Sequence, residues 1–397
     1  MTETLRVAVR RFAAFETAIV RQFDDFARHS GRDVTLVAEP LDLNPLHAAL
    51  IGRRELAGPD WDIAFLPTDW IAEAQALGLI EDLQPWLARA PVADFPDAWS
   101  PSLLGLQRFA GGFWGMPYHD GPECLIVRKD LLDAAGLAVP TTWAAFHDTA
   151  RRLHDPAHGI AGTVLALFPD GHNGFYDFCI QLWTRGAAPF DDAGRPLLDT
   201  PVAAAALDFL RTLARDTTAV PDGLQQIDSV RSGMMFAEGR VAMMANWFGF
   251  AAFAESWHDS RVKGRIDIAP LPAGPGGESA SLNVFWVLAI AAGSRRKALA
   301  WDFLRHCATA PMDRLTTLEG AVGVRRSTWS DPEVNRDVPY YHKLEGLHAR
   351  ARALPPHPRL SEIAHTIDAM MQQAVTGTRP SADLLAEAQA RLLEIVA

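Results

Sequence analysis

The residues best suited to chemistry lie between Trp114 and Glu123, in the stretch WGMPYHDGPE. Its two glycines and two prolines interrupt regular secondary structure, and the glycines allow the backbone to absorb changes in dihedral angle. Tyr118, His119 and Asp120 offer an aromatic face, donors and acceptors, which suit a polar ligand. Asp120 and Glu123 are also a carboxylate pair of the kind that glycosidases use as acid and base. A tight surface connection between two elements would explain the same residues, so the stretch alone does not decide between a structural and a functional role.

Tryptophan is the second signal in the sequence. The chain has 12 tryptophans, and five of them stand beside expected strand ends or polar turns: Trp70, Trp114, Trp183, Trp247 and Trp286. An indole face can cover the apolar C–H face of a sugar while carboxylate, amide and guanidinium groups bind its hydroxyls. Core packing is the commoner role for a single tryptophan. Five of them near loops favour a shared cleft.

Motifs for several enzyme classes are missing from the sequence. It has no G-x-S-x-G elbow, no phosphate-binding G-x-x-x-x-G-K-[ST] loop, no G-x-G-x-x-G after its first strand and no H-E-x-x-H. His119 with Asp120 and His172 with Asn173 are the His-centred pairs considered for a metal, and hydrogen-bonding or surface roles are favoured for both. Cys124, Cys179 and Cys307 are far apart and are expected to be small buried side chains. We therefore expect no metal and no cofactor.

The first hundred residues alternate strand and helix patterns. Short apolar runs at residues 5–9, 33–37 and 61–66 predict strands, with helices between them and a third helix from Trp70 to Leu77. This β-α-β-α-β order is typical of a doubly wound parallel sheet, in which ligands bind beyond the carboxyl ends of the strands. Arg11 and Phe12 follow the first strand, and Asp69 and Trp70 follow the third. These residues are expected at the binding edge.

A second α/β region begins after Gly112. Leu125–Val127 is a strand candidate, Thr142 and Thr200 are expected N-caps, and residues 163–168 are expected to form a strand. Further helices are predicted at 175–184, 201–215, 229–238, 294–307, 311–318, 360–375 and 381–396, and further strands at 240–245, 266–269 and 284–291. No internal repeat or low-complexity segment interrupts the chain.

Composition narrows the class of protein. The chain has 397 residues, 49% hydrophobic and 21% charged, and a formal net charge of −11, which is ordinary for a globular protein and argues against binding nucleic acid or anionic lipid. No apolar run has the length of a membrane span, and the first residues lack the pattern of a signal peptide. We expect a periplasmic protein whose leader has been removed, or a cytoplasmic one if Met1 is the native start.

Four passages, taken in order, resemble the extracellular solute-binding proteins of carbohydrate ABC transporters, the family that includes the maltose-binding type. They cover nearly the whole chain. They are PDWDIAFLPTDWIAEAQALGLIEDLQPWL, GGFWGMPYHDGPECLIVRKDLLDAAGLAVPTTWAAF, FAEGRVAMMANW, and IDIAPLPAGPGG with FWVLAIAAGSRRKALAWDFLRHC. The chain departs from the family at Leu282-Asn283, where relatives often have Gly-Gly.

The resemblance implies a two-lobed α/β fold of the type II periplasmic-binding-protein class, each lobe a doubly wound sheet flanked by helices. The lobes are expected to comprise 1–118 with 281–317, and 119–280 with 318–397, with hinge crossings near 118, 280 and 318. A monomeric, non-catalytic receptor would close on a small sugar by hinge motion and deliver it to permease subunits. The ligand-binding residues expected are Arg11, Phe12, Asp69, Trp70, Tyr118, His119, Asp120, Glu123, Asn173, Tyr176, Trp183, Trp247, Phe248, Asn283, Trp286 and Arg325.

Two rival functions remain open at this point. One is a glycoside-acting enzyme that uses Asp120 and Glu123 as acid and base. The other is a receptor for a non-sugar solute, such as a polyamine, a phosphodiester or a chelated metal. Within the sugar hypothesis, Arg11 and Arg325 leave room for an acidic sugar.

Overall fold

The structure is a computed structural model that describes residues 2–191 and 193–397. It divides into two compact units, and the chain contributes to each of them more than once. The first unit comprises residues 1–121, 283–348 and 356–358, and the second comprises 122–282, 349–355 and 359–397. The main passages between the units therefore follow Gly121, Leu282 and His348.

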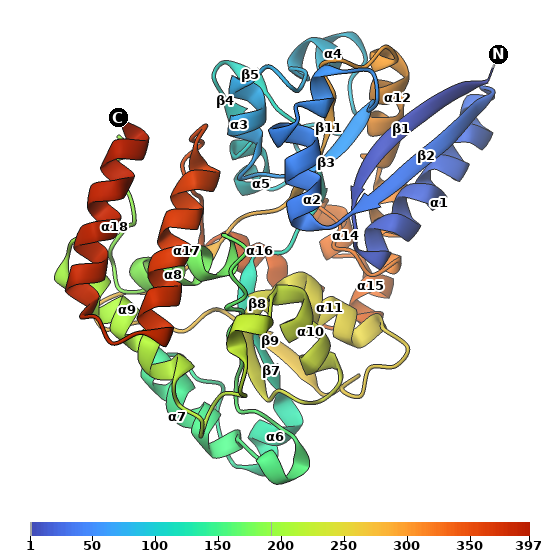
Figure 1. The fold of residues 1–397 in the computed structure, drawn as a ribbon. Helices are drawn as coiled ribbons and strands as arrows, with labels where there is room; N and C mark the ends of the chain where they lie inside the picture. The colour runs from blue at the N-terminus through green and yellow to red at the C-terminus, as the bar shows by residue number, and fades with distance from the viewer. Residues whose placement is uncertain (1, 192) are drawn as a thin grey trace. The chain divides into compact units, whose positions relative to one another are not determined.

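The first unit is built on a five-stranded mixed sheet with the order β2-β1-β3-β11-β6 (Figure 1). Its first three strands are parallel, and β11 runs antiparallel to both β3 and β6. The sheet strands are β1 Glu3–Arg10, β2 Val34–Leu41, β3 Ile63–Pro67, β6 Met116–His119 and β11 Trp286–Ile290, and a separate hairpin pairs β4 Arg108–Phe109 with β5 Gly112–Phe113. The helices are α1 Ala13–Ser30, α2 Leu43–His47, α3 Ile71–Ala76, α4 Gln84–Arg89, α5 Pro101–Gly105, α12 Lys297–Cys307, α13 Ala310–Leu318, α14 Arg326–Trp329, α15 Pro332–Asp337 and α16 Leu344–His348, with short η1 Ala48–Gly52, η2 Glu55–Ala57 and η5 Tyr341–Lys343 turns.

Helix α1 shows how the sequence specifies this unit. Phe15, Ile19, Phe23 and Phe26 recur at helical spacing, and all four are buried, as predicted. Their stripe packs toward β2, α12 and α13. The helix ends at Gly31, whose φ of 64° places it in the left-handed region that glycine adopts without strain.

The second unit contains a small sheet in which β7 lies between β8 and β9, antiparallel to both. Its strands are β7 Glu123–Arg128, β8 Met243–Trp247 and β9 Ile266–Ala269, and a separate parallel pair joins β10 Ser281–Leu282 to β12 Ala351–Arg352. Its helices are α6 Lys129–Ala134, α7 Trp143–Leu153, α8 Asn173–Trp183, α9 Pro201–Ala214, α10 Ser229–Ala237, α11 Phe248–Ser256, α17 Leu360–Thr376 and α18 Ser381–Val396, with short η3 Pro156–His158 and η4 Leu224–Gln226 turns. Helix α17 packs against α8, α9 and α18 (Figure 1).

Local capping signals in this unit are confirmed. The Thr142 hydroxyl accepts the Ala145 N–H at the start of α7, and the Thr200 hydroxyl accepts the Ala203 N–H at the start of α9. Each cap satisfies an N–H that the first turn of a helix leaves without a partner. The two helices accordingly begin where the sequence predicted.

The structure corrects three expectations about architecture. The sheet of the second unit is antiparallel and three-stranded, where a doubly wound sheet was expected. Residues 163–168 form no strand, because Thr163 and Phe168 donate their N–H groups singly to Ala219 and Ile227 instead of joining a ladder. Residues 318–348 belong to the first unit, so the third passage follows His348 and not residue 318.

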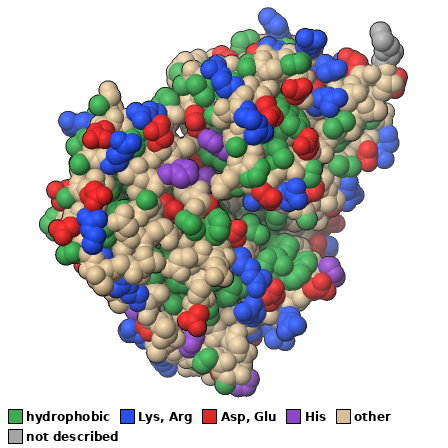
Figure 2. Space-filling model, viewed as in Figure 1, with side chains coloured by type: hydrophobic (Ala, Val, Ile, Leu, Met, Phe, Trp, Pro, Cys, Tyr) green, Lys and Arg blue, Asp and Glu red, His purple; other side chains and the backbone are tan. Residues whose placement is uncertain are grey.

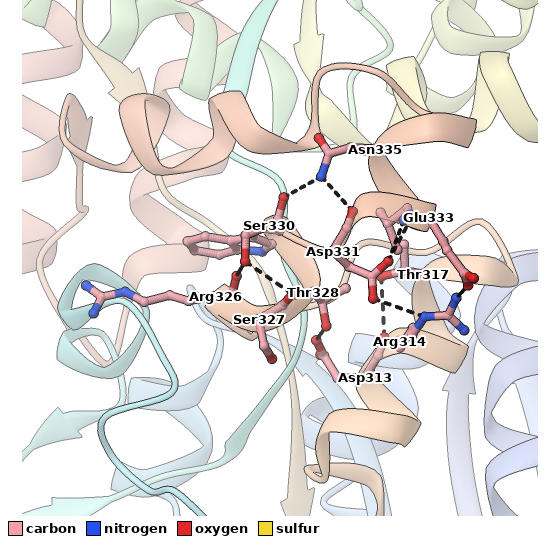
Figure 3. Close-up of polar contacts among 12 residues, drawn as sticks. Asp313, Arg314, Thr317, Arg326, Ser327, Thr328, Ser330, Asp331, Glu333 and Asn335 are labelled. Carbon is pink, nitrogen blue, oxygen red and sulfur yellow. Dashed lines mark hydrogen bonds and ion pairs between the residues drawn. The ribbon is translucent and has the colours of Figure 1, made fainter.

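Helices α13 to α15 are held in the first unit by a dense polar network (Figure 3). The buried Asp313 carboxylate accepts the Val324 N–H at 2.7 Å, the Arg325 N–H at 3.1 Å and the Thr328 hydroxyl at 2.5 Å. Arg314 adds ion pairs to Asp331 and Glu333. These bonds tie residues 323–333 back to α13, which explains why this segment stays with the first unit.

Three further features concern the cysteines, the length of the helices and the surface charge. All three cysteines are buried, as predicted, and each is a free thiol. None of the helices in the described part of the chain is long and apolar enough to cross a membrane. On the face shown in Figure 2, acidic and basic side chains are interspersed.

Candidate functional site

In the first unit, several predicted residues meet at one edge of the sheet. Trp286, the first residue of β11, pairs with Pro67 at the end of β3 and with His119 at the end of β6. Phe12 follows β1, which is parallel to β3, so it emerges at the same edge. The strand order therefore brings together residues that lie more than one hundred positions apart in sequence.

The rings of Phe12, His119 and Trp286, hereafter the aromatic edge, gather around the buried Phe15. Their ring centroids lie 5.1, 4.8 and 5.8 Å from that of Phe15. All three are half-buried, so part of each ring remains open to solvent. A half-exposed group of rings over a packed base can receive the apolar face of a ligand.

His119 contributes a defined hydrogen-bond donor to the aromatic edge. Its Nδ1 accepts the Val322 N–H at 2.8 Å, which leaves the proton of the neutral ring on Nε2. Burial lowers the pKa of His119 to about 4, although the nearby Asp120 charge acts in the opposite direction. His119 is therefore neutral at physiological pH, and Nε2–H can donate.

Other predicted residues near this edge differ in exposure. Trp70 is buried, with its ring 6.4 Å from that of Trp286, and it supports the aromatic edge from below. Asp69 is half-buried. Arg11 is exposed, and its guanidinium contacts the Pro40 carbonyl and Asp42.

Two predicted ligand residues are committed to the interior of the first unit. The Tyr118 hydroxyl donates to Gln22 at 2.9 Å, and Gln22 in turn contacts Met312 and Thr316. The Arg325 guanidinium is 2% exposed, lies over the Trp99 ring and donates to the Ala308 carbonyl at 2.8 Å. Both side chains therefore have structural roles, which correct the expected ligand roles.

Asp120 and Asn283 join a network that the sequence did not reveal. Asp120 Oδ2 lies 2.7 Å from His348 Nε2, and His348 Nδ1 lies 2.9 Å from the Ser102 hydroxyl. Asn283 donates from Nδ2 to the Ser102 carbonyl at 3.0 Å. Asp120 Oδ1 and Asn283 Oδ1 are buried acceptors without a hydrogen-bond partner in the described residues. Buried acceptors of this kind indicate that water or a ligand hydroxyl supplies a donor.

In the second unit, Glu123 and Trp247 stand opposite each other at the end of the β7–β8 ladder. The Trp247 ring is half-buried and makes an edge contact with Tyr176 of α8 at 5.7 Å. Trp183 is half-buried at the far end of α8, seven residues after Tyr176 and therefore on the same helical face. Phe248 is fully buried at the start of α11, so it belongs to the core and not to a binding surface.

Glu123 experiences the charge of a buried carboxyl group that the sequence analysis missed, that of Asp177. Burial raises the pKa of Glu123 well above its usual range, and the Asp177 charge raises it further. Burial also raises the pKa of Asp177 to about 7. Since both pKa values are raised, the pair holds at least one proton at neutral pH and can both donate and accept. Asp177 lies one helical turn after the predicted Asn173, a spacing that could have revealed it.

Asn173 opens α8 beside Asp170. It is buried, and it donates its backbone and side-chain N–H groups to the Asp170 carboxylate at 3.4 and 3.3 Å. This arrangement satisfies the amide locally. Across the described residues, no group of three or more His, Cys, Asp and Glu side chains is placed to hold a metal ion.

Comparison with known proteins places this geometry in a family. The model of the bacterial extracellular solute-binding proteins matches residues 13–312. The chain belongs to this family.

Similarity to individual members of the family extends over most of the chain. A probable ABC transporter-binding protein of Deinococcus radiodurans is 25% identical over 338 residues, which cover 84% of this chain and 78% of that protein. A mannitol-binding protein of Pseudomonas aeruginosa is 26% identical over 385 residues, which cover 90% and 85%. The solved structure of maltose-bound MalE3 from T. maritima superposes with a TM-score of 0.91 at 23% identity and full coverage of both chains. This solute-binding protein therefore has the expected two-lobed α/β fold of the maltose-binding type.

The burial of Arg325 in this solute-binding protein leads to a stability prediction. Replacing Arg325 with Met should lower the free energy of unfolding by about 2–3 kcal/mol, because the Ala308 carbonyl loses its donor in a buried position. Urea denaturation of the variant and the wild type measures the difference. Binding of neutral solutes should stay within about twofold of wild type, and a selective loss of binding in a fully stable variant would contradict the structural role.

A pH prediction follows from Asp368 in α17. Burial, then the Asp170 charge, raises the pKa of Asp368 from its usual 3.8 to about 6. The folded state thus binds this proton more tightly than the unfolded state. The resulting stabilisation is complete below about pH 4 and is lost as the pH rises through 6. We expect urea denaturation at pH 5 and pH 8 to show this loss in the wild type and to show a smaller loss in Asp368→Asn. An identical pH dependence in the variant would contradict it.

Proposed function

We propose that this protein is the receptor of an ABC importer and that its ligand is a small neutral sugar or polyol. The observation that carries the proposal is the aromatic edge, where Phe12, His119 and Trp286 leave parts of three rings exposed around Phe15. Rings of this kind bind the C–H faces of sugars. Family membership and the mannitol-binding and maltose-bound relatives support the same ligand class.

The polar groups of the second unit suit hydroxyl groups better than a charged ligand. Glu123 and Asp177 retain a proton at neutral pH, so they offer a donor and an acceptor with reduced negative charge. The half-buried Trp247 opposite Glu123 adds an apolar face. Arg325 is committed to Ala308 and Asp94, which removes the basis for an acidic sugar at that position.

We further propose that ligand binding is accompanied by hinge motion at the passages between the units. The aromatic edge is the candidate binding surface of the first unit, and Glu123, Asp177, Tyr176 and Trp247 are the candidate contact residues within the second. The protein would act outside the cytoplasmic membrane, as the family description indicates. It would deliver the bound ligand to membrane permease subunits. The proposal also includes a monomeric state and no affinity for nucleic acid.

The proposal includes no catalysis. The acid–base pair of the enzyme hypothesis, Asp120 and Glu123, is divided between the two units, and the Asp120 carboxylate is held by His348 at 2.7 Å. Chromogenic α- and β-glycosides should give no turnover above that of buffer. Turnover that disappears in Asp120→Asn would favour the enzyme.

A solute panel tests the binding function. Thermal shift and calorimetry should detect binding of at least one compound among hexitols, pentitols, monosaccharides, maltose and short arabino-oligosaccharides. Uronates, polyamines, phosphodiesters and amino acids should give no response. A clear response to polyamines or amino acids together with none to any sugar or polyol would overturn the proposal.

A further inference from the structure

The three main passages of the chain between the units, after Gly121, Leu282 and His348, share an unusual property on the side of the first unit. Asp120 lies just before the first passage, Asn283 just after the second, and His348 just before the third. All three side chains are buried, at 0%, 2% and 6% exposure. The structure connects them through a single residue, Ser102 of α5.

Each link in this connection is a hydrogen bond of ordinary length. His348 spans Asp120 Oδ2 at 2.7 Å and the Ser102 hydroxyl at 2.9 Å, while the Ser102 carbonyl accepts from Asn283 at 3.0 Å. A carboxylate can only accept, so Nε2 of His348 carries a proton toward Asp120. The Trp329 ring stacks on the imidazole at 4.8 Å with an interplanar angle of 10° and fixes its orientation.

The second unit fastens its own ends of the same passages. The Ser281 hydroxyl donates to the Glu123 carbonyl, two residues after the first passage. The Ser281 N–H donates to the Arg350 carbonyl at 3.1 Å, two residues after the third passage. The β10–β12 pairing extends this link by placing Ser281 beside Ala351.

We propose that Ser102, His348 and Ser281 are positioning residues that make the three passages move as one hinge. Hydrogen bonds hold a residue on each side of a passage, so only a short stretch of chain lies between the two. In the first passage this stretch is Gly121-Pro122. Gly121 has a φ of 149°, a conformation that favours glycine, and it can absorb a dihedral change at low cost. The order Ser–His–Asp is also that of an acyl-transfer relay, but His348 and Asp120 both adjoin passages and Ser102 also holds Asn283 at the remaining one, which favours a mechanical role. This inference rests on the proposed hinge motion.

Hydrogen–deuterium exchange of the full-length protein without ligand tests the linkage. His348→Phe keeps an aromatic ring against Trp329 and removes both imidazole hydrogen bonds. We expect amide exchange to become about tenfold faster in all three passages, at residues 119–123, 281–284 and 347–351, because one buried anchor has been lost. Faster exchange confined to residues 344–351, or spread evenly over the first unit, would overturn the inference.

Two further variants keep the test decisive. His147→Phe is the matched control, since His147 is a buried histidine that contacts Asp216 at 2.8 Å within the second unit, and it should leave the three passages unchanged. Ser102→Ala removes the hydroxyl that contacts His348 but keeps the carbonyl that Asn283 uses and the His348–Asp120 bond, so it should accelerate exchange in the same three passages to a smaller extent. If His348→Phe fails to fold, an unchanged exchange pattern in Ser102→Ala overturns the inference.

The exchange experiment separates this inference from the proposed function. It needs no ligand, so a failed solute panel would overturn the sugar receptor and leave the linkage result intact. Conversely, a wild-type protein that binds a polyol but shows no linked exchange in the variants would retain its function and lose the common hinge.

Discussion

Replacing Trp286 with Ala is expected to weaken binding of the best sugar or polyol in the panel by about 30- to 100-fold. The indole lies at the centre of the aromatic edge, paired through the sheet with both Pro67 and His119, and it remains half-exposed in the free protein. Covering an aromatic face of this size contributes about 2–3 kcal/mol, which is the stated range of affinity. Isothermal titration calorimetry measures the loss directly.

Trp86→Ala is the matched control for this prediction. Trp86 is also half-buried, but it lies on α4, where Arg89 approaches its ring, and it is not part of the sheet edge. Its removal should change the affinity by less than about twofold. Equal losses in Trp86→Ala and Trp286→Ala, or no loss in Trp286→Ala, would show that the aromatic edge is not the binding surface.

The pH dependence of solute binding provides a second test of the aromatic edge. With the pKa of His119 lowered to about 4, Nε2–H remains a donor from pH 8 down to pH 5, so the affinity should be nearly constant over that range as far as His119 is concerned. His119→Phe keeps the ring contacts and removes this donor. A loss of about tenfold is expected from one hydrogen bond to the ligand.

Replacing Asp313 with Ala is expected to give the largest loss of stability among the variants considered, about 3–5 kcal/mol. Asp313 is 3% exposed, and its carboxylate accepts from the N–H groups of Val324 and Arg325. It also accepts from the hydroxyl of Thr328 (Figure 3). Each of these buried donors loses its acceptor in the variant, and each costs about 1–3 kcal/mol. Urea denaturation gives the free energy of unfolding, from the midpoint and the slope.

Thr328→Val removes one of the three donors and leaves the carboxylate in place. It should destabilise the protein by about 1 kcal/mol, clearly less than Asp313→Ala. Similar stabilities for the two variants would mean that the backbone bonds to Asp313 contribute little. In that case another interaction must hold residues 323–333 against α13.

Local patterns in the sequence were sufficient for many elements of the fold. The apolar stripe of α1, the hydroxyl caps at Thr142 and Thr200, and the left-handed glycine at position 31 act within a few residues of the chain. Such signals specify a helix and its ends without reference to the rest of the protein. The predicted helices at 360–375 and 381–396 accordingly match α17 and α18 closely.

The apolar segment at 163–168 shows where local patterns fail. Four of its six residues are buried, but Phe168 is exposed, and the backbone makes single hydrogen bonds to two different loops. Burial and strand pairing are separate properties, and an apolar run predicts only the first. The same limit applies to Phe248, whose position after a strand suggested exposure although its ring fills the core.

The sequence by itself determined the family, the two-lobed α/β class and the sheet edge at which Phe12, Asp69 and Trp70 emerge, because strand order and loop position are local and cumulative signals. Only the tertiary structure decided which side chains remain exposed to solvent at that edge and which form hydrogen bonds in the interior of a unit. Tyr118 donates a hydrogen bond to Gln22, and Arg325 donates one to the Ala308 carbonyl. Asp120 accepts one from His348, which lies 228 residues further along the chain. Direction and partner depend on what packs against a side chain from distant segments, and no spacing in the sequence encodes that. The stretch from Trp114 to Glu123 therefore contributes one ring to the aromatic edge and one carboxylate to the network at the three passages.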